Sequence, residues 1–390
     1  GAEQLFPDNG HPADKATYSF RLTVPEPYLA VANGVLVDRI TEGGATTTVW
    51  ASRDPIASYL VTVHAGEIDL VEQTAPNGLR LQFAFAEDVP ASQRAVFDRT
   101  EEIVAYFEGV FGPYPFETAG ATVVSQFLWF ALETQGLPIF GSLAVLGGDD
   151  LAPQDLADFE ETVVHELAHQ WFGDNVTPLR WQDIWLNEGF ATYSQYLWVE
   201  HTRGIAARDE RLAESYDFVA AQIRLTDPGI RPTLTGLDVL EVFGLPPEEL
   251  PAELLALFGV ETVAELADIS FDEALARFAA EGVPLGLLLV EPALTGDPGP
   301  DQLFSSISVY QRGALAVHAL RLEVGDDAFF AILRGWTARY RNGNATVDDF
   351  AALAEEVSGR ELDAFFAAWL FSPELPPLAI DRAGGATPVP

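Results

Sequence analysis

Two histidines and a glutamate in the middle of the chain have the types and spacing that bind a metal ion. The segment HELAH places His165 and His169 four residues apart, so on an α-helix both imidazoles lie on one face. Glu188 follows after eighteen intervening residues, which is enough for a loop and the start of a second helix. Together the three side chains predict a His₂Glu zinc site with one tetrahedral position left for water.

The open coordination position determines the chemistry that such a site performs. Zinc lowers the pKa of bound water to about 7 and polarises a carbonyl oxygen that approaches it. Glu166 lies beside the first ligand and is not needed to bind the metal. We therefore assign it as the general base that takes the water proton and hands it to the leaving amine. HExxH also arises by chance on amphipathic helices, and the spacing of Glu188 argues against chance here.

Composition narrows the classes of function. The 390-residue sequence contains no cysteine, which excludes thiolate metal ligands, disulfides and cysteine nucleophiles. Its formal net charge of −38 argues against nucleic acid as a partner, because like charges repel. The apolar runs are far shorter than the roughly eighteen residues that span a bilayer, so we expect no membrane span. Either a salty or extracellular setting or a need for solubility explains this charge. We expect an extracellular or periplasmic location rather than a cytoplasmic one.

The elements that position these side chains follow from the apolar pattern. Alternating runs separated by Gly, Pro and Asn turns predict antiparallel strands between residues 18 and 85. The stretch from 234 to 300 is rich in Leu, Ala and Glu with Pro breaks, which predicts short helices joined by turns. Apolar spacing predicts further strands at 121–125 and 143–146, and helices at 92–111, 155–172, 184–201, 309–323, 326–340, 347–357 (capped by Thr346) and 362–370.

The segment HELAHQWFGDNVTPLRWQDIWLNEGFATY, residues 165–193, closely resembles the zinc signature of the M1 aminopeptidase family, which also includes an epoxide-opening hydrolase. In that family an exopeptidase loop, commonly GAMEN, precedes the zinc helix, and FALET at 130–134 occupies the equivalent place. Ala131 and Glu133 match the loop. The resemblance implies that both bind substrate, with Glu133 holding its free α-amino group. A carboxylate near the metal is suited to that role, because it pairs with an ammonium and directs cleavage to the peptide bond after the first residue of the substrate.

SVYQRGALAVHALRL at 308–322 resembles the family segment that bears a catalytic tyrosine. The resemblance implies that Tyr310 donates a hydrogen bond to the developing oxyanion, although a lone tyrosine before a helix is more often a packing residue. The opening FPDNGHPADKATYSFRLTVP looks like part of the family's N-terminal β domain. Family members carry further β structure before this point, including a second acidic or amide group for the substrate amine, so we expect a partial domain here.

These observations predict an α+β fold in two domains. We expect a partial antiparallel β domain over residues 1–88 and a thermolysin-like, mainly helical zinc catalytic domain over residues 89–378. A helical insertion is expected at about residues 234–300 and a tail at 379–390.

The expected function is that of a zinc metallo-aminopeptidase with one Zn²⁺, acting on peptides with a free N-terminus. Two alternatives stay open. One is a zinc hydrolase of another bond, such as an epoxide, and the other is an inactive zinc-binding fragment.

Overall fold

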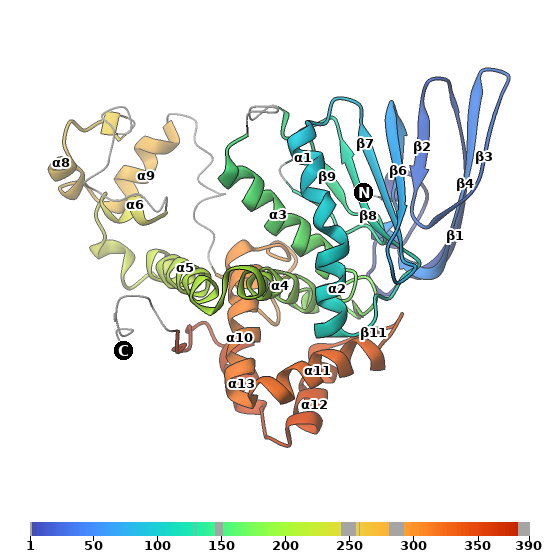
Figure 1. The fold of residues 1–390 in the computed structure, drawn as a ribbon. Helices are drawn as coiled ribbons and strands as arrows, with labels where there is room; N and C mark the ends of the chain where they lie inside the picture. The colour runs from blue at the N-terminus through green and yellow to red at the C-terminus, as the bar shows by residue number, and fades with distance from the viewer. Residues whose placement is uncertain are drawn as a thin grey trace.

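The structure is a computed structural model that describes residues 2–128, 130–144, 151–242, 255–256, 258–280 and 292–380. Strands gather at one side of the molecule and helices fill the other (Figure 1). The N-terminal part is built of antiparallel strands and the C-terminal part is helical, which confirms the predicted α+β class.

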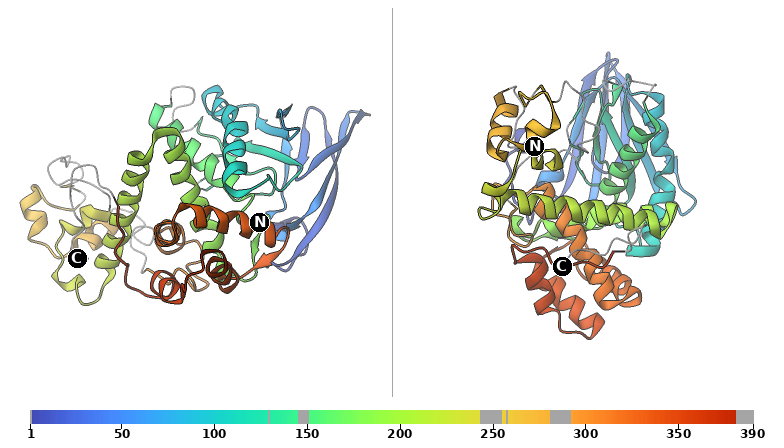
Figure 2. Two further views of the ribbon diagram at one scale, coloured as in Figure 1. Left: turned by 60° about the horizontal axis from the view of Figure 1, so that its bottom comes forward. Right: turned by 90° about the vertical axis from the view of Figure 1, so that its left-hand side faces the viewer.

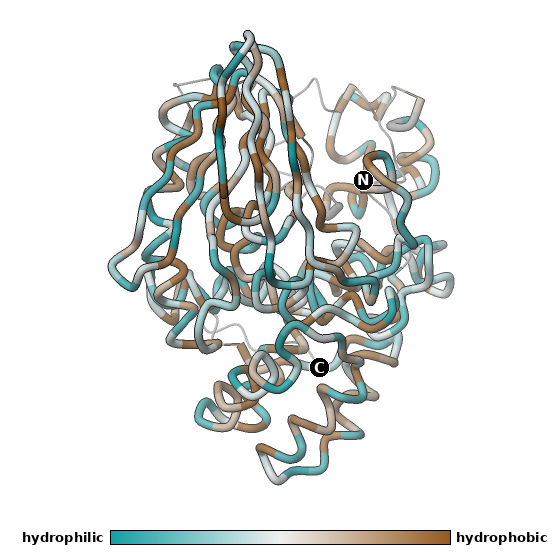
Figure 3. Tube along the Cα trace, turned by 90° about the vertical axis from the view of Figure 1, so that its right-hand side faces the viewer, coloured by the Kyte–Doolittle hydropathy of each residue, from teal (hydrophilic) through white to brown (hydrophobic). Residues whose placement is uncertain are grey.

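Most strands of the N-terminal region pair with antiparallel neighbours. β1 (Lys15–Pro25), β4 (Ala45–Ala57) and β3 (Val35–Glu42) form a three-stranded sheet in the order β1-β4-β3, and β2 (Leu29–Ala32) pairs with β5 (Val63–Gly66). Along most of β1, partly buried residues alternate with exposed ones. Figure 3 shows this region from outside, with hydrophilic and hydrophobic residues following one another along the strands. The period of two is that of a sheet with one covered face.

A second sheet links the two halves of the chain. It contains β6 (Ile68–Thr74), β7 (Arg80–Ala86), β8 (Thr118–Val124) and β9 (Ile139–Gly141) in that order. β6 pairs antiparallel with β7, whereas β7, β8 and β9 are parallel to one another. The boundary that we predicted after residue 88 therefore falls between strands of one sheet.

The strand predicted at 143–146 lies earlier in the chain, at β9. The side chain of Gln93 explains where β9 ends, because its Nε2 donates to the carbonyl oxygen of Gly141 and its Oε1 accepts from the backbone N–H of Leu143. These two bonds occupy backbone groups that a longer strand would offer to a neighbour. Residues 145 and 146 lie outside the described part of the chain.

Helices cover the second sheet and form the body below it (Figures 1 and 2). They are α1 (Ala91–Val96), α2 (Thr100–Phe111), α3 (Pro153–Ala168), α4 (Trp185–Arg203), α5 (Ile205–Thr226), α10 (Arg312–Val324), α11 (Asp326–Arg339), α12 (Val347–Ser358) and α13 (Asp363–Leu370). No helix of the described chain has the length and apolar character needed to cross a membrane.

Two of the predicted helices differ in detail. The helix expected at 92–111 is divided by a 3₁₀ turn, Phe97–Arg99, and α10 is preceded by a π-helical turn, Ser306–Gln311. The predicted cap of α12 is confirmed, because Thr346 Oγ1 accepts from the backbone N–H of Asp349. π turns are frequent at functional sites, and this one contains Tyr310.

The described part of the insertion has a small core of its own. α6 (Asp238–Val242), α8 (Val263–Ala267) and α9 (Phe271–Ala280) lie beyond α5, on the side away from the strands (Figure 1). Its buried cluster includes Leu234 and Phe258. Short helices are thus confirmed where residues are described, and the remaining residues of this stretch lie outside them.

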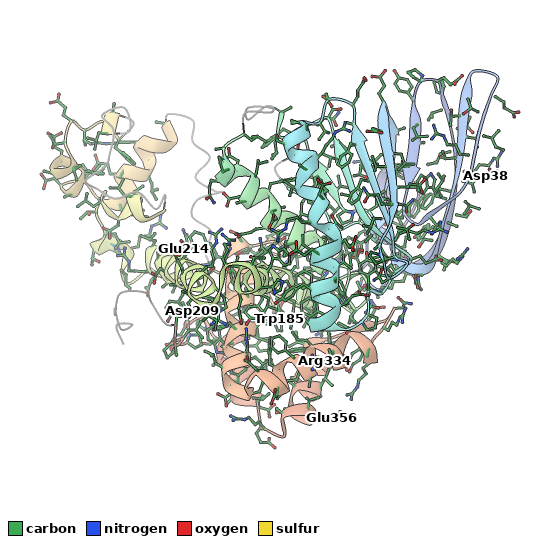
Figure 4. The ribbon with its side chains drawn as sticks, viewed as in Figure 1. Asp38, Trp185, Asp209, Glu214, Arg334 and Glu356 are labelled. Carbon is green, nitrogen blue, oxygen red and sulfur yellow. The ribbon has the colours of Figure 1, made fainter. Side chains whose placement is uncertain are left out.

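The main core lies between the second sheet and the helices. Trp185, Phe190 and Phe350 are fully or almost fully buried and contact one another edge to face or tilted. Figure 4 shows Trp185 among crowded side chains in the interior, whereas Asp38 and Glu356 lie at the periphery. This aromatic packing holds the start of α4 rigidly, and α4 carries one of the predicted metal ligands.

Candidate metal centre and active site

Two helix ends bring the three predicted metal ligands together. His165 lies in the last turn of α3, His169 directly follows that helix, and Glu188 lies in the first turn of α4. The Nε2 atoms of the two histidines are 3.0 Å apart, and each lies 3.2 Å from Glu188 Oε2. All three side chains are buried. The expectation that these residues converge is therefore met.

The donor set fits a zinc ion. In a tetrahedral site with bonds of about 2.0–2.1 Å, neighbouring ligand atoms lie roughly 3.3 Å apart. The three separations at this site, 3.0 to 3.2 Å, are close to that value. Two imidazoles and one carboxylate are also the ligands that catalytic zinc takes in peptidases.

Electrostatics favour a cation at the same point. Burial lowers the pKa of His165. Burial also acts to lower the pKa of His169, but Glu188 and Glu133 outweigh it and raise that pKa well above its ordinary value. Burial acts to raise the pKa of Glu188, yet His169 and His165 outweigh it and lower that pKa to about 2. A buried group with more carboxylates than imidazoles therefore attracts positive charge.

A second set of contacts orients the two histidines. His169 donates from Nδ1 to the carbonyl oxygen of Phe172, 3.0 Å away, which leaves Nε2 facing the other ligands. The side chain of Gln195 hydrogen-bonds His165. Gly173 has a φ of +132°, and a Cβ there would come within 3.3 Å of His169 Nδ1. The turn after α3 is therefore built closely around the second ligand.

Glu166 and Glu133 lie next to the ligands without belonging to the closest set. Ligand atoms of Glu133, Glu166 and His169 all lie within 4.8 Å of one another, and both glutamates are buried. Burial is the main cause that raises the pKa of each carboxyl group. Glu166 Oε2 accepts no hydrogen bond among the described residues. It is thus a buried acceptor beside the metal position, as a general base requires.

Tyr310 contacts two of the ligands. Its ring stacks on His165 with centroids 5.8 Å apart, and its hydroxyl hydrogen-bonds Glu188. Burial, then the charge of Glu188, raises the pKa of Tyr310, so the hydroxyl stays protonated and acts as a donor. The structure thus places Tyr310 at the site.

The loop predicted to bind the substrate amine is held against the zinc helix. Leu132 and Ile139 exchange two backbone hydrogen bonds, and Ala131 packs on the main core. Gln170, the residue after HELAH, donates from Nε2 to the carbonyl oxygen of Glu133 and accepts at Oε1 from the N–H of Gly136. The substrate-binding roles of Ala131 and Glu133 stay predictions.

Tyr59 is a site residue that the sequence did not reveal. Its hydroxyl donates to Glu133 Oε1 at 3.4 Å and accepts from Asn187 Nδ2 at 3.5 Å. Its ring meets Trp181 edge to face. Tyr59 lies in a 3₁₀ turn of the N-terminal region, and no local pattern distinguishes it from a core tyrosine. Only the contact between its turn and the distant segment that contains Glu133 identifies Tyr59 as a site residue.

A groove of about 350 Å³ lies near the ligands. Gln195, Thr192 and Gln311 are among its lining residues. Gln195 also contacts His165, and Gln311 directly follows Tyr310. The groove therefore adjoins the metal centre through Gln195 and Gln311.

The comparisons with known proteins point to zinc metallopeptidases. Residues 95–228, which include all three metal ligands, match the peptidase family M1 domain. The predicted resemblance is thereby confirmed. A solved M1 zinc metallopeptidase from Deinococcus radiodurans superposes with a TM-score of 0.69 at 25% identity, covering 99% of this chain and 70% of that one.

Curated relatives extend the similarity over almost the whole chain. Aminopeptidase M1-B of Oryza sativa subsp. japonica is 25% identical over 370 residues, and Aminopeptidase N of Streptomyces lividans is 26% identical over 382 residues. These matches cover 94% and 95% of this chain but only 35% and 36% of the two relatives. The chain thus spans little more than a third of the length of these curated relatives.

Proposed function

We propose that this chain is a zinc aminopeptidase that binds one Zn²⁺ through His165, His169 and Glu188 and removes the N-terminal residue of a peptide. Two kinds of similarity support the activity. The curated relatives are named aminopeptidases, and a mutant of the Deinococcus radiodurans enzyme was solved with the substrate Tyr-Ser-Ala. That structure has a TM-score of 0.68 and 25% identity, and the match covers 96% of this chain and 68% of that one.

The buried carboxylate of Glu133 carries the proposal from hydrolase to aminopeptidase. It lies within 4.8 Å of His169 and Glu166, so an ammonium paired with it would place the first peptide bond at the metal. A charge-assisted hydrogen bond of this kind is strong and directional. An internal segment of a polypeptide has no free α-ammonium beside the peptide bond, which restricts cleavage to the free end.

The remaining residues divide the reaction between them. Zinc, when bound, polarises the peptide carbonyl and makes water acidic enough to attack it near neutral pH. Glu166 takes a proton from the attacking water while the water oxygen bonds to the carbonyl carbon. Tyr310 donates its hydroxyl hydrogen to the oxygen on which negative charge develops. As the C–N bond breaks, Glu166 passes the proton to the leaving amine nitrogen.

A panel of aminoacyl-arylamides, assayed with and without a chelator, tests the proposal. We expect turnover that the chelator abolishes and added zinc restores, and we expect N-acetylated counterparts to remain uncleaved. Cleavage of acetylated and free substrates at equal rates would contradict the role of Glu133. A chain that holds zinc but turns over none of the substrates would favour an inert zinc-binding fragment.

A further inference from the structure

Lys15 is the only lysine in the 390-residue sequence, and it lies at the start of β1. Its Nζ donates to three backbone carbonyl oxygens: Asp174 at 2.9 Å, Asn175 at 3.1 Å and Gly343 at 3.1 Å. The acceptors lie 159, 160 and 328 residues away in the chain. One ammonium therefore joins β1 to two distant segments of the chain.

The first of these segments is the turn that follows the zinc helix. Asp174 donates its N–H to the carbonyl oxygen of His169 at 3.0 Å, while the carbonyl oxygen of Phe172 accepts from His169 Nδ1. The same turn thus contacts both the backbone and the imidazole ring of His169. Whatever fixes this turn also fixes the direction in which His169 Nε2 points.

The second segment braces the turn from the C-terminal side. Asn342 donates its N–H to Asn175 Oδ1 at 2.9 Å. Just beyond, β10 (Thr177–Pro178) pairs in parallel with β11 (Asn344–Ala345). Lys15 connects both segments to the N-terminal strands, because it extends from β1 and donates to carbonyl oxygens of each.

An ammonium is the group that suits this position. It carries three donors on one compact atom, whereas a guanidinium spreads five donors over a rigid plane. The other twenty basic residues of the sequence are arginines, so lysine stands here against a strong preference for arginine elsewhere. The carboxyl group of Asp174 is fully buried and accepts no hydrogen bond among the described residues. Burial is the main cause that raises its pKa well above the ordinary value, and the charge of Lys15 opposes that rise.

We propose that Lys15 is a positioning residue of the metal centre: it holds the turn after the zinc helix so that His169 keeps the orientation that binds zinc. Retention of the metal then depends on contact between the N-terminal strands and the helical body. The inference rests on the metal centre proposed above, but not on the peptidase reaction.

The absence of cysteine from the sequence allows a direct test. In Lys15→Cys the single thiol can be aminoethylated in denaturant, which restores a lysine-like ammonium, or carboxamidomethylated, which leaves a neutral side chain of similar length. After refolding with zinc, the rate at which a chelator removes the metal is measured. Loss of a contact that orients a metal ligand typically costs about 10- to 100-fold in affinity, so we expect at least about tenfold faster release from the carboxamidomethylated protein. Aminoethylation should return the rate to within about twofold of wild type.

Thr23→Cys, at an exposed position on the same strand, controls for the chemical treatment and should release zinc at the wild-type rate after either modification. Equal release rates in all forms of Lys15→Cys, with wild type holding zinc, would overturn the positioning role alone. A wild-type chain that binds no zinc would overturn the metal centre and this inference with it.

A second measurement needs no variant. Apart from the chain's N-terminal amine, Lys15 is the one amine that an acylating reagent can modify. If the ammonium is tied to the metal centre, chelation should speed acylation of Lys15 several-fold, measured by peptide mass spectrometry. Acylation at the same rate with and without zinc would contradict the coupling, even if the Lys15→Cys proteins did not refold.

Discussion

Gly189 of α4 and Gly313 of α10 lie against each other, so closely that a Cβ on Gly189 would come within 2.9 Å of the Gly313 carbonyl carbon. Gly189 follows the ligand Glu188, and Gly313 lies three residues after Tyr310. Two residues without side chains let the helices approach until ligand and tyrosine meet in one site.

Gly189→Ala should therefore separate Glu188 from Tyr310. Overpacking of this kind typically costs about 1–3 kcal/mol, and a displacement of about 1 Å at an active site can cost about 100-fold in rate. We expect a lower free energy of unfolding and a kcat reduced by at least tenfold. Gly109→Ala is the matched control, because a Cβ there meets nothing within 4 Å on the exposed face of α2. It should leave kcat unchanged, and equal effects of the two substitutions would contradict the argument.

Glu166→Gln should separate metal binding from catalysis. The substitution keeps the size of the side chain but removes its ability to accept a proton, and general-base groups contribute about 10²- to 10⁴-fold. We expect a loss of kcat in that range with one zinc per chain retained, measured by metal analysis beside steady-state kinetics. Full activity in this variant would rule out Glu166 as the base.

Tyr310→Phe should lower kcat and leave KM within about twofold. The phenyl ring can keep its stacking on His165, while the donor to the developing oxyanion is lost. Removal of one such donor costs about 10²- to 10³-fold in other hydrolases. A variant with normal kcat would show that Tyr310 only packs against the ligand.

Tyr59→Phe should weaken recognition of the substrate amine rather than the chemical step. The hydroxyl donates to Glu133 Oε1, and hydrogen bonds to charged groups contribute about 1.5–3 kcal/mol, so we expect KM to rise about tenfold. Tyr106→Phe removes a hydroxyl that donates to the carbonyl oxygen of Leu197 instead, and it should leave KM unchanged. A rise in KM in both variants would indicate general loosening of the fold.

The free energy of unfolding should fall in acid because His318, which is distant in sequence from the metal ligands, is buried. Burial first, and then the charges of Arg208 and Arg321, lower the pKa of His318 to about 3. Its Nδ1 lies 3.1 Å from the Tyr193 hydroxyl. The unfolded chain takes up this proton near pH 6.5 and the folded chain does not, so the contribution is complete above about pH 6.5 and is lost as pH falls below it.

The expected slope from this one group is at most about 1.4 kcal/mol per pH unit. Urea unfolding of chelated protein between about pH 7.5 and 4.5 measures it, with His318→Gln as the comparison. In the variant the free energy of unfolding should fall less steeply with decreasing pH, by a slope that corresponds to at most one proton. A steeper decline in the variant would contradict the assignment.

The sequence predicted what depends on local geometry. His165 and His169 are one helical turn apart, so their convergence needs only the helix, and Glu188 needs only a second helix start nearby. Tyr310 was predicted by resemblance, but its π-helical turn was not, because such turns leave no periodic signal. The helix expected at 92–111 was correct in extent and missed the 3₁₀ turn in the middle.

Contacts between distant segments could not be predicted. Tyr59 reaches Glu133 across 74 residues, and Lys15 reaches Asp174 across 159. Lys15 is the only lysine of the sequence, yet no local pattern shows what it or Tyr59 contacts, because both contacts form only when the N-terminal strands pack on the helices. The parallel pairing of β7 with β8 was missed for the same reason, because alternation along a strand does not reveal the direction of its neighbour.

That pairing has a consequence for how the molecule assembles. A fragment ending at residue 88 would leave one long side of β7 with unsatisfied backbone groups, and its mostly buried side chains, including Phe83, would be uncovered. Such an edge recruits other chains and aggregates. Completing this sheet therefore requires β8, which lies beyond the predicted domain boundary.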